Sequence, residues 1–286
     1  MTMNTHQILL PVYRALRPVV DRCRLNALAR PVWAALWKRD AKGLVRAKQN
    51  GRMWWLDPEV ALRGEEAEIE TAQWLQSVIK PGMTVVDVGA NVGQMTLEMA
   101  HLVGPMGRVI AIEPGPGNLA VLRRHVEGNG YADRVTIIAA ACCAVHGGRM
   151  ELDIPGGNAA GVGSGFQLSG IGIVQNPQAA SMPNTKLSVS TVSLDGIVTA
   201  WRFSPAVLKI DVEGAELEVF RGGSELLARR KPAVRFGFHP FAFDDAGKAQ
   251  SAIKALLLKA GLRVEREFAG PWGLSEINAG PAGRVA

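Results

Sequence analysis

Residues 85–94, VVDVGANVGQ, have the residue types of a ligand-binding turn. An apolar run contains Asp87 and is followed by Gly89, Asn91 and Gly93. Glycine lets the backbone approach a ligand closely, and asparagine is the other residue that best tolerates a left-handed conformation. A dinucleotide-binding turn would have the spacing G-x-G-x-x-G and a pyrophosphate that the acid here would repel. The turn therefore predicts a ligand without a pyrophosphate and disfavours an NAD-dependent dehydrogenase.

A second acid, Glu113, ends the next apolar run, RVIAI. An ionised carboxylate has two acceptor oxygens, so at the tip of a second strand it can accept hydrogen bonds from both hydroxyls of a ribose. The other interpretation is that Asp87 caps the following helix and that Glu113 is a surface acid. Together with the glycine turn, the two acids indicate a nucleoside that carries no phosphate.

A third group of titratable residues follows two later apolar runs: Asp211 and Glu213 after one, and His239 after the other. At the carboxyl ends of parallel strands such side chains share one crevice and can carry out acid–base chemistry. We expect His239 or Asp211 to be the base, with Glu213 and Glu216 shaping the site. His239 hydrogen-bonded only to backbone, and Lys209 as a simple charge partner of the acids, are the structural alternatives. Because only two carboxylates converge, we predict no metal.

The elements that must position these residues alternate from residue 83 onward. The expected strands are 84–88, 108–112, 135–141, 207–212 and 233–238, with later candidates 263–267 and 272–277. The expected helices between them are 94–102, 118–127, 215–220 and 248–260. This alternation predicts an α/β fold, a doubly wound and mostly parallel sheet with helices on both faces.

Before the sheet, residues 43–56 contain Asn50-Gly51 between two alternating segments, which predicts a β-hairpin, and residues 65–79 have helical periodicity. Within it, residues 154–185 form a glycine-rich insert. We expect this insert to be a loop that covers the substrate site through Phe166 and residues 171–174; the alternative is a loop that is only exposed to solvent.

The chain resembles the FkbM-type S-adenosylmethionine-dependent methyltransferases over residues 80–240. The resemblance rests on DVGANVGQ (87–94), IEP (112–114), TVSLD (191–195), LKIDVEGAELEVFRG (208–222) and the strand that ends in His239-Pro240. It implies the class I methyltransferase (Rossmann-like) fold, with seven strands of which the last is antiparallel. It also implies methyl transfer from S-adenosyl-L-methionine, usually to a hydroxyl oxygen.

Carried over by position, the resemblance assigns the methionine and ribose portions of the cofactor to the turn, and the ribose to the second acid. The cofactor-binding residues so predicted are Asp87, Gly89, Ala90, Asn91, Gly93, Glu113 and Pro114. The predicted catalytic residues are Asp211, Glu213 and His239. One departure is Gly237, because family members commonly have Glu two residues before this histidine, and that puts the usual substrate or the activity in question.

Charge and composition are unevenly distributed along the 286 residues. Residues 1–52 hold eleven Lys or Arg against two Asp, a net charge of +9, so the other 234 residues carry −3 to give the chain's total of +6. We expect domains at 1–60, a basic amphipathic helical arm with the hairpin, and at 61–286, the cofactor-binding domain. Three cysteines, two of them adjacent, cannot build a disulfide framework, which favours a reducing, cytoplasmic location. Tryptophan and leucine opposite arginine in residues 8–40 suggest a peripheral membrane contact, although docking onto the body or a second subunit needs no such partner.

The sequence thus predicts an O-methyltransferase acting on a hydroxyl of a small molecule, sugar, glycan or polyketide-like acceptor. A second hypothesis is a cofactor-binding scaffold that has lost catalysis, which predicts binding without turnover. A nucleic-acid methyltransferase is disfavoured, because N-P-P-[YF] and D-P-P motifs are missing from the sequence and aromatic residues are only 6%. A homo-oligomer is compatible with the sequence but is not predicted by any motif.

Overall fold

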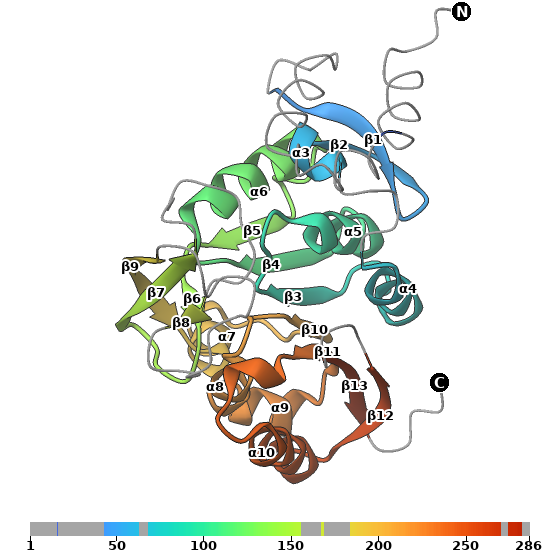
Figure 1. The fold of residues 1–286 in the computed structure, drawn as a ribbon. Coiled ribbons are helices and arrows are strands. Elements are labelled where there is room, and N and C mark those ends of the chain that lie inside the picture. Colours follow the sequence, from blue (N-terminus) through green and yellow to red (C-terminus); the bar gives the residue numbers. More distant parts are fainter. Residues whose placement is uncertain are drawn as a thin grey trace, which may run out of the picture.

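The structure is a computed structural model that describes residues 43–62, 68–155, 167–168, 184–269 and 274–281, together with Leu16. Its centre is a seven-stranded sheet with the order β12-β13-β11-β10-β3-β4-β5 (Figure 1). The strands are β3 (Thr84–Val88), β4 (Arg108–Ile112), β5 (Val135–Ile138), β10 (Val207–Ile210), β11 (Ala233–Phe238), β12 (Leu262–Ala269) and β13 (Ser275–Pro281). β10, β11, β3, β4 and β5 pair in parallel, whereas β13 is antiparallel to both of its neighbours.

This strand order confirms the expected doubly wound fold of class I methyltransferases. The chain leaves β3 toward β4 on one side and later returns to β10 on the other side. The carboxyl ends of β3 and β10 therefore flank the point at which the winding reverses, which is where such sheets bind ligands.

Helices cover both faces of the sheet because the buried strands alternate their side chains between two apolar clusters. Val85 faces one cluster, which also contains side chains of three helices, whereas Val86 and Val88 face the other, which contains side chains of four helices. The first three helices are α4 (Ile69–Val78), α5 (Gln94–Val103) and α6 (Pro116–Gly128). The others are α7 (Leu194–Trp201), α8 (Glu216–Arg221), α9 (Ser224–Arg230) and α10 (Ala246–Lys259), with the short 3-10 helix η1 (Pro240–Ala242) after β11.

The predicted hairpin is present as β1 (Val45–Gln49) and β2 (Arg52–Leu56), followed by the short helix α3 (Pro58–Ala61). Asn50 and Gly51 both have positive φ, as a tight turn of this kind requires. The hairpin and α3 share one buried cluster with side chains of α5 and α6. The domain boundary expected between residues 60 and 61 lies within that cluster, and the arm of residues 1–42, apart from Leu16, lies outside the described residues.

A second sheet, of order β6-β9-β7-β8, frames the glycine-rich insert. Its strands are β6 (Ala141–Cys142), β7 (Arg149–Pro155), β8 (Gln167–Leu168) and β9 (Asn184–Val192). The sequence did not predict β7 to β9; β7 and β9 pair in antiparallel fashion through seven residues each. The insert expected over residues 154–185 thus begins and ends in paired strands, and its expected acceptor contacts at Phe166 and residues 171–174 lie outside the described residues.

Two helices that the periodicity missed, α7 and α9, are stabilised at their starts by polar side chains. Ser193 caps α7, because its hydroxyl accepts a hydrogen bond from the Gly196 amide at 3.1 Å. The α9 helix has no side-chain cap of its own; the Asp195 carboxylate of α7 instead accepts hydrogen bonds from the amides of Glu225 and Leu226 at 3.1 and 2.7 Å.

Among the helices of the described ranges, none is long and apolar enough to span a bilayer.

Candidate cofactor and acceptor site

The glycine turn connects β3 to α5 and forms one wall of the main pocket. Asn91 has a left-handed φ of 50°, and its side-chain oxygen accepts a hydrogen bond from the Val92 amide at 2.7 Å. Gly89 has a φ of +75°, and a Cβ atom there would lie 1.8 Å from the carbonyl oxygen of Asp211. The glycine is therefore needed for the close approach of the turn to β10, in addition to the ligand approach expected from the sequence.

Glu113 directly follows β4 and lies beside this turn, with its carboxylate held by three donors. Oε2 accepts a hydrogen bond from the Asn91 amide at 2.8 Å, and Oε1 accepts from the Gly115 amide at 2.9 Å and from Asn118 Nδ2 at 3.2 Å. Burial raises the pKa of this carboxyl, and the three hydrogen bonds oppose that rise. A carboxylate has about four lone-pair positions, so Glu113 can still accept hydrogen bonds from a ligand.

Asp87 lies behind the turn and does not line the pocket. Its side chain is fully buried; Oδ2 accepts a hydrogen bond from Thr96 Oγ1 at 2.6 Å, and Oδ1 lies 3.5 Å from Lys209 Nζ. Lys209 also donates to the Gly89 carbonyl at 3.2 Å and lies 3.7 Å from Asp211 Oδ2. Burial alone would lower the pKa of Lys209, but Asp87 and Asp211 raise it well above its ordinary value. The buried Asp87–Lys209 pair thus ties the turn to β10.

The pocket occupies the winding reversal between β3 and β10 and holds about 850 Å³ of empty space, including the part open to solvent. Of the predicted cofactor residues, Gly89, Ala90, Asn91, Glu113 and Pro114 line it. Gly93 does not, because it packs under α6, where a Cβ atom would lie 2.4 Å from Leu122 Cδ1. Apolar side chains that also line it are Val92, Met95, Ile112, Ala141, Cys142, Leu152, Val212 and Ala215.

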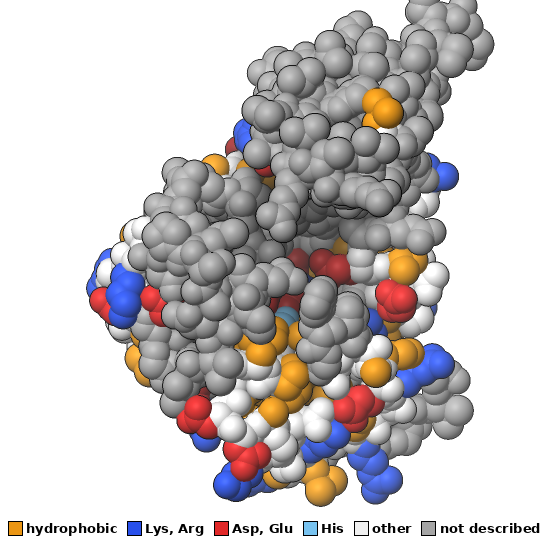
Figure 2. Space-filling model, in the orientation of Figure 1, with side chains coloured by type: hydrophobic (Ala, Val, Ile, Leu, Met, Phe, Trp, Pro, Cys, Tyr) orange, Lys and Arg blue, Asp and Glu red, His pale blue; other side chains and the backbone are white. Residues whose placement is uncertain are grey.

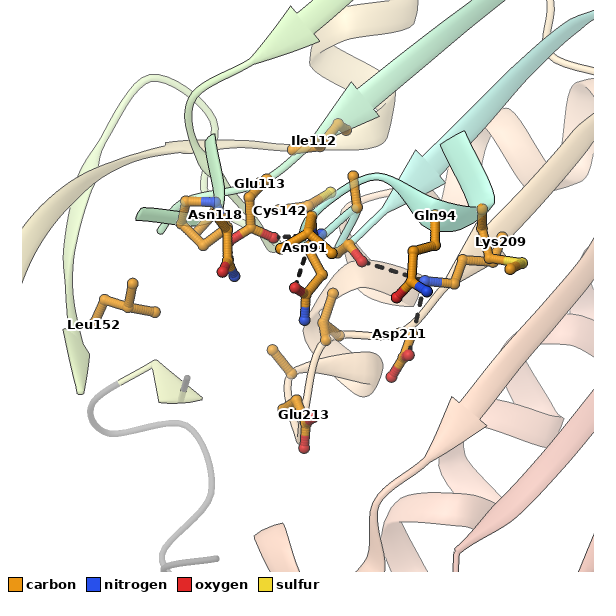
Figure 3. Close-up of a pocket in the computed structure, with 18 of the residues that line it drawn as sticks. Asn91, Gln94, Ile112, Glu113, Asn118, Cys142, Leu152, Lys209, Asp211 and Glu213 are labelled. Atoms are coloured by element: carbon orange, nitrogen blue, oxygen red, sulfur yellow. Dashed lines mark hydrogen bonds and ion pairs between the residues drawn. The ribbon is translucent and has the colours of Figure 1, made fainter. Parts of the chain in front are cut away.

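The two ends of the pocket differ in chemistry (Figure 3). Glu113 and Asn118 lie at one end, and Gln94, Lys209 and Asp211 lie at the other. The Gln94 side-chain nitrogen is buried and has no hydrogen-bond partner within the described part of the chain. A nucleoside with an amino acid tail fits this arrangement: the carboxylate suits ribose hydroxyls, the apolar side chains suit a purine, and Gln94 offers a donor to a carboxylate.

The three predicted catalytic residues come together at the carboxyl ends of β10 and β11. His239 Nε2 lies 3.5 Å from Asp211 Oδ1 and 3.6 Å from Glu213 Oε2, and its Nδ1 lies 2.7 Å from Glu216 Oε1. Glu216 is fully buried and also accepts a hydrogen bond from the Gly214 amide at 2.9 Å. Glu213 has a left-handed φ of 53°, and Gly214 packs against Ala242. The alternative in which His239 is hydrogen-bonded only to backbone is therefore wrong, because its Nδ1 is hydrogen-bonded to the Glu216 side chain.

These carboxylates keep the His239 imidazole charged. Burial would lower its pKa, but the hydrogen bond and charge of Glu216, with Asp211 and Glu213, raise it to about 9. At neutral pH both ring nitrogens therefore carry protons: Nδ1 donates a hydrogen bond to Glu216, and Nε2 lies near the carboxylates of Asp211 and Glu213. In Figure 2, acidic side chains and a histidine are visible at the bottom of a hollow in this face of the molecule.

Two acids near this site were not expected from the sequence. Glu68 lies immediately before α4, lines the pocket and has a left-handed φ of 48°. Although the residue as a whole is exposed, desolvation of the carboxyl group by its surroundings raises its pKa to about 7; the charges of Asp211, Asp87 and Glu276 act in the same direction, and Lys209 opposes them. Glu276, on the last strand, pairs across the sheet with Gly237. No local pattern marks either residue, because each reaches the site only through the tertiary fold.

No group of three or more His, Cys, Asp or Glu side chains within the described ranges is arranged to hold a metal ion. Cys142 and Cys143 are buried free thiols. Burial raises the pKa of the Cys142 thiol, which therefore contributes to the pocket as an apolar side chain.

The fold and this pocket define a class I methyltransferase. The family model "Methyltransferase FkbM domain" matches residues 87–264, so the chain belongs to the FkbM methyltransferase family, as the resemblance implied. This membership confirms the expected class of protein, a methyltransferase domain.

Individual relatives are more distant. The chain is 43% identical over 67 residues to the protein-L-isoaspartate O-methyltransferase of Hyperthermus butylicus, over 21% of this chain and 28% of that protein. It is 30% identical over 121 residues to the demethylmenaquinone methyltransferase of Symbiobacterium thermophilum, over 42% of each chain. The chain therefore spans less than half the length of these curated relatives. The crystal structure of methyltransferase FkbM from Methylobacillus flagellatus KT matches 73% of this chain and 51% of that chain, with 15% identity and a TM-score of 0.44.

Proposed function

We propose that this protein transfers a methyl group from S-adenosyl-L-methionine to a hydroxyl oxygen of a small molecule, sugar, glycan or polyketide-like acceptor. The observation that carries the proposal is that one pocket has the Glu113 carboxylate at one end and, at the other, the carboxylates of Asp211 and Glu213, which lie beside His239. When bound, the cofactor supplies a methyl carbon that is electrophilic because it is attached to a sulfonium.

The cofactor end is formed by Glu113 with the turn. Glu113 accepts hydrogen bonds from the ribose hydroxyls, Asn118 and the Asn91 amide keep its carboxylate in place, and Gln94 donates to the carboxylate of the methionine portion. Asp87 acts indirectly, by holding Lys209 against the Gly89 carbonyl and so fixing the turn. Asp87 is thus a positioning residue in this proposal.

At the acceptor end, Asp211 is the proposed base. Its carboxylate is partly exposed to the pocket and can take the proton of the acceptor hydroxyl. His239 is already protonated at neutral pH, so it acts as a fixed cation that orients Asp211 and Glu213. Most of the rate enhancement then comes from holding the acceptor oxygen in line with the methyl carbon.

The test is transfer of labelled methyl from S-adenosyl-L-methionine to pools of hydroxylated compounds, with the product then treated with mild alkali. The proposal predicts label in a product that survives alkali, because an ether is stable and a carboxyl methyl ester is hydrolysed. An alkali-labile product would assign the enzyme to carboxylate acceptors. Binding of the cofactor with no transfer to any pool would support the scaffold hypothesis.

The mechanism also predicts a pH profile. With Asp211 as the base, the rate does not rise as the pH approaches 9, because the proton that His239 loses there is not the one that the reaction transfers. A rate that rises as the pH approaches 9 would instead identify His239 as the base, because its imidazole loses its proton there.

A further inference from the structure

Gly237 lies on β11 directly beneath the catalytic cluster, and its missing side chain leaves a small space between three functional groups. A Cβ atom at this position would lie 3.4 Å from Glu276 Oε1, 3.4 Å from His239 Cε1 and 3.5 Å from Asp211 Oδ1. Groups from the ends of three strands thus surround one space, and the Cβ atom of any residue other than glycine would occupy it. Glycine inside a buried strand weakens the strand, so its presence here calls for a reason in the site.

Glu276 reaches this point because of the sheet register. β13 is antiparallel to β11, and Glu276 is the residue directly opposite Gly237. Its two carboxylate oxygens have separate surroundings: Oε2 lies 3.3 Å from the buried Arg235 guanidinium, and Oε1 faces the space above Gly237. Arg235 also donates to Asn278 and Thr71 and therefore does not depend on Glu276 alone.

We propose that Gly237 and Glu276 form the acceptor subsite, in which Glu276 Oε1 accepts a hydrogen bond from a hydroxyl of an uncharged, hydroxyl-rich acceptor. This inference rests on the proposed function. The space admits a carbon or oxygen atom of the acceptor beside Asp211, the proposed base. Carboxylate oxygens only accept hydrogen bonds, so Asp211, Glu213 and Glu276 together select hydroxyl donors. The same charges repel a carboxylate or phosphate on the acceptor.

A purely structural interpretation makes a different prediction. If Glu276 served only to neutralise Arg235, and Gly237 only to relieve crowding in the sheet, substitutions at both positions would change stability and leave ligand binding unchanged. The alanine methyl group at position 237 would lie 3.4 to 3.5 Å from its three neighbours, which is the short end of ordinary van der Waals contact. Gly237→Ala is therefore expected to fold. Glu276→Gln keeps the shape of the side chain and leaves Arg235 with two other partners.

The probe is methyl α-D-glucopyranoside, added at millimolar concentrations to the protein loaded with S-adenosylhomocysteine. The readout is the NMR signal of the His239 Cε1 proton, because that carbon borders the space, and a His239→Gln variant assigns the signal. The carboxylated analogue, methyl α-D-glucopyranosiduronate, and the amino analogue, methyl α-D-glucosaminide, test the charge preference. Gly247→Ala and Glu265→Gln, both remote from the pocket, are the matched controls.

We expect the neutral glycoside to shift the His239 signal in a saturable way and the uronate to bind at least about tenfold more weakly. Gly237→Ala and Glu276→Gln should each weaken the neutral glycoside by about tenfold or more, with unchanged binding of S-adenosylhomocysteine. If S-adenosylhomocysteine binds but the neutral glycoside leaves His239 unchanged, or if it binds equally to both variants, the subsite is wrong while the proposed function stands. A preference for the uronate or the amino sugar also overturns it. Failure of S-adenosylhomocysteine to bind the native protein would instead contradict the proposed function.

Discussion

The Glu216→Gln substitution tests whether the buried carboxylate of Glu216 holds His239 in its charged form. Glu216 Oε1 lies 2.7 Å from His239 Nδ1 and is the principal favourable partner of the imidazolium. The difference between a pKa of about 9 and the ordinary 6.5 corresponds to about 3 kcal/mol of preference for the charged ring. Glutamine retains an oxygen that can accept from the Gly214 amide, so the loop geometry is kept and mainly the charge is lost.

Without that charge, burial dominates, and the pKa of His239 should fall to about 6.5 or below. Because the folded-state pKa is raised above its unfolded value, its stabilising contribution is complete below pH 6.5 and is lost as the pH rises through 9. The native protein should therefore exceed the variant in free energy of unfolding by about 3 kcal/mol at pH 6, and the difference should narrow by pH 9.5.

The assay combines NMR titration of the His239 ring with urea unfolding at pH 6 and at pH 9.5. Glu218→Gln is the matched control, because Glu218 lies on the same helix and pairs with the exposed Arg221. The reasoning is refuted if native His239 titrates near 6.5, if its pKa stays near 9 in Glu216→Gln, or if the stability difference is the same at both pH values.

Three further substitutions test the elements around the site. Gly89→Ala should abolish cofactor binding in calorimetry and lower the melting temperature. Residue 89 has a left-handed φ, and its added Cβ would lie 1.8 Å from the Asp211 carbonyl oxygen. Native-like binding would contradict this packing. Lys209→Met should cost about 3–5 kcal/mol in chemical unfolding at pH 7, because it leaves the Asp87 carboxylate buried without its charge partner, and a cost below 1 kcal/mol would show that the pair is not needed. Trp54→Ala should cost about 3–5 kcal/mol, because this buried side chain joins the hairpin to the domain core, whereas an unchanged midpoint would mean that the hairpin folds without stabilising the domain.

Elements of the central sheet could be predicted because their signals are local. The expected strands 84–88, 108–112 and 233–238 match β3, β4 and β11 residue for residue, since each is an apolar run bounded by turn residues and buried on both faces. The hairpin was equally clear from Asn50-Gly51. In these segments the local sequence is enough to indicate a buried strand or a tight turn, without knowledge of the residues that pack against it.

The missed elements depend on partners that are distant in sequence. β7 and β9 pair with each other across an insert, so neither has a run that stands out alone. α9 takes its N-terminal hydrogen bonds from Asp195, about thirty residues earlier. For the same reason only part of the site could be predicted. Glu113, Asp211, Glu213 and His239 follow apolar strands and could be found from the sequence. Glu276 reaches the site only through the register of the sheet, and Asp87 pairs with Lys209 behind the turn and does not line the pocket.

The central claim is that the pocket binds S-adenosyl-L-methionine through Glu113, and calorimetric titration of the purified protein tests it most directly. We predict binding in the micromolar range, on the order of −8 kcal/mol. In Glu113→Ala the binding should weaken by about 100-fold or more, because two hydrogen bonds from ribose to a charged acceptor are lost. Glu151→Ala, at an exposed ion pair with Lys186, should bind like the native protein, and circular dichroism should show that all three proteins are folded. Absence of binding by folded native protein, or equal binding by Glu113→Ala, would contradict the account.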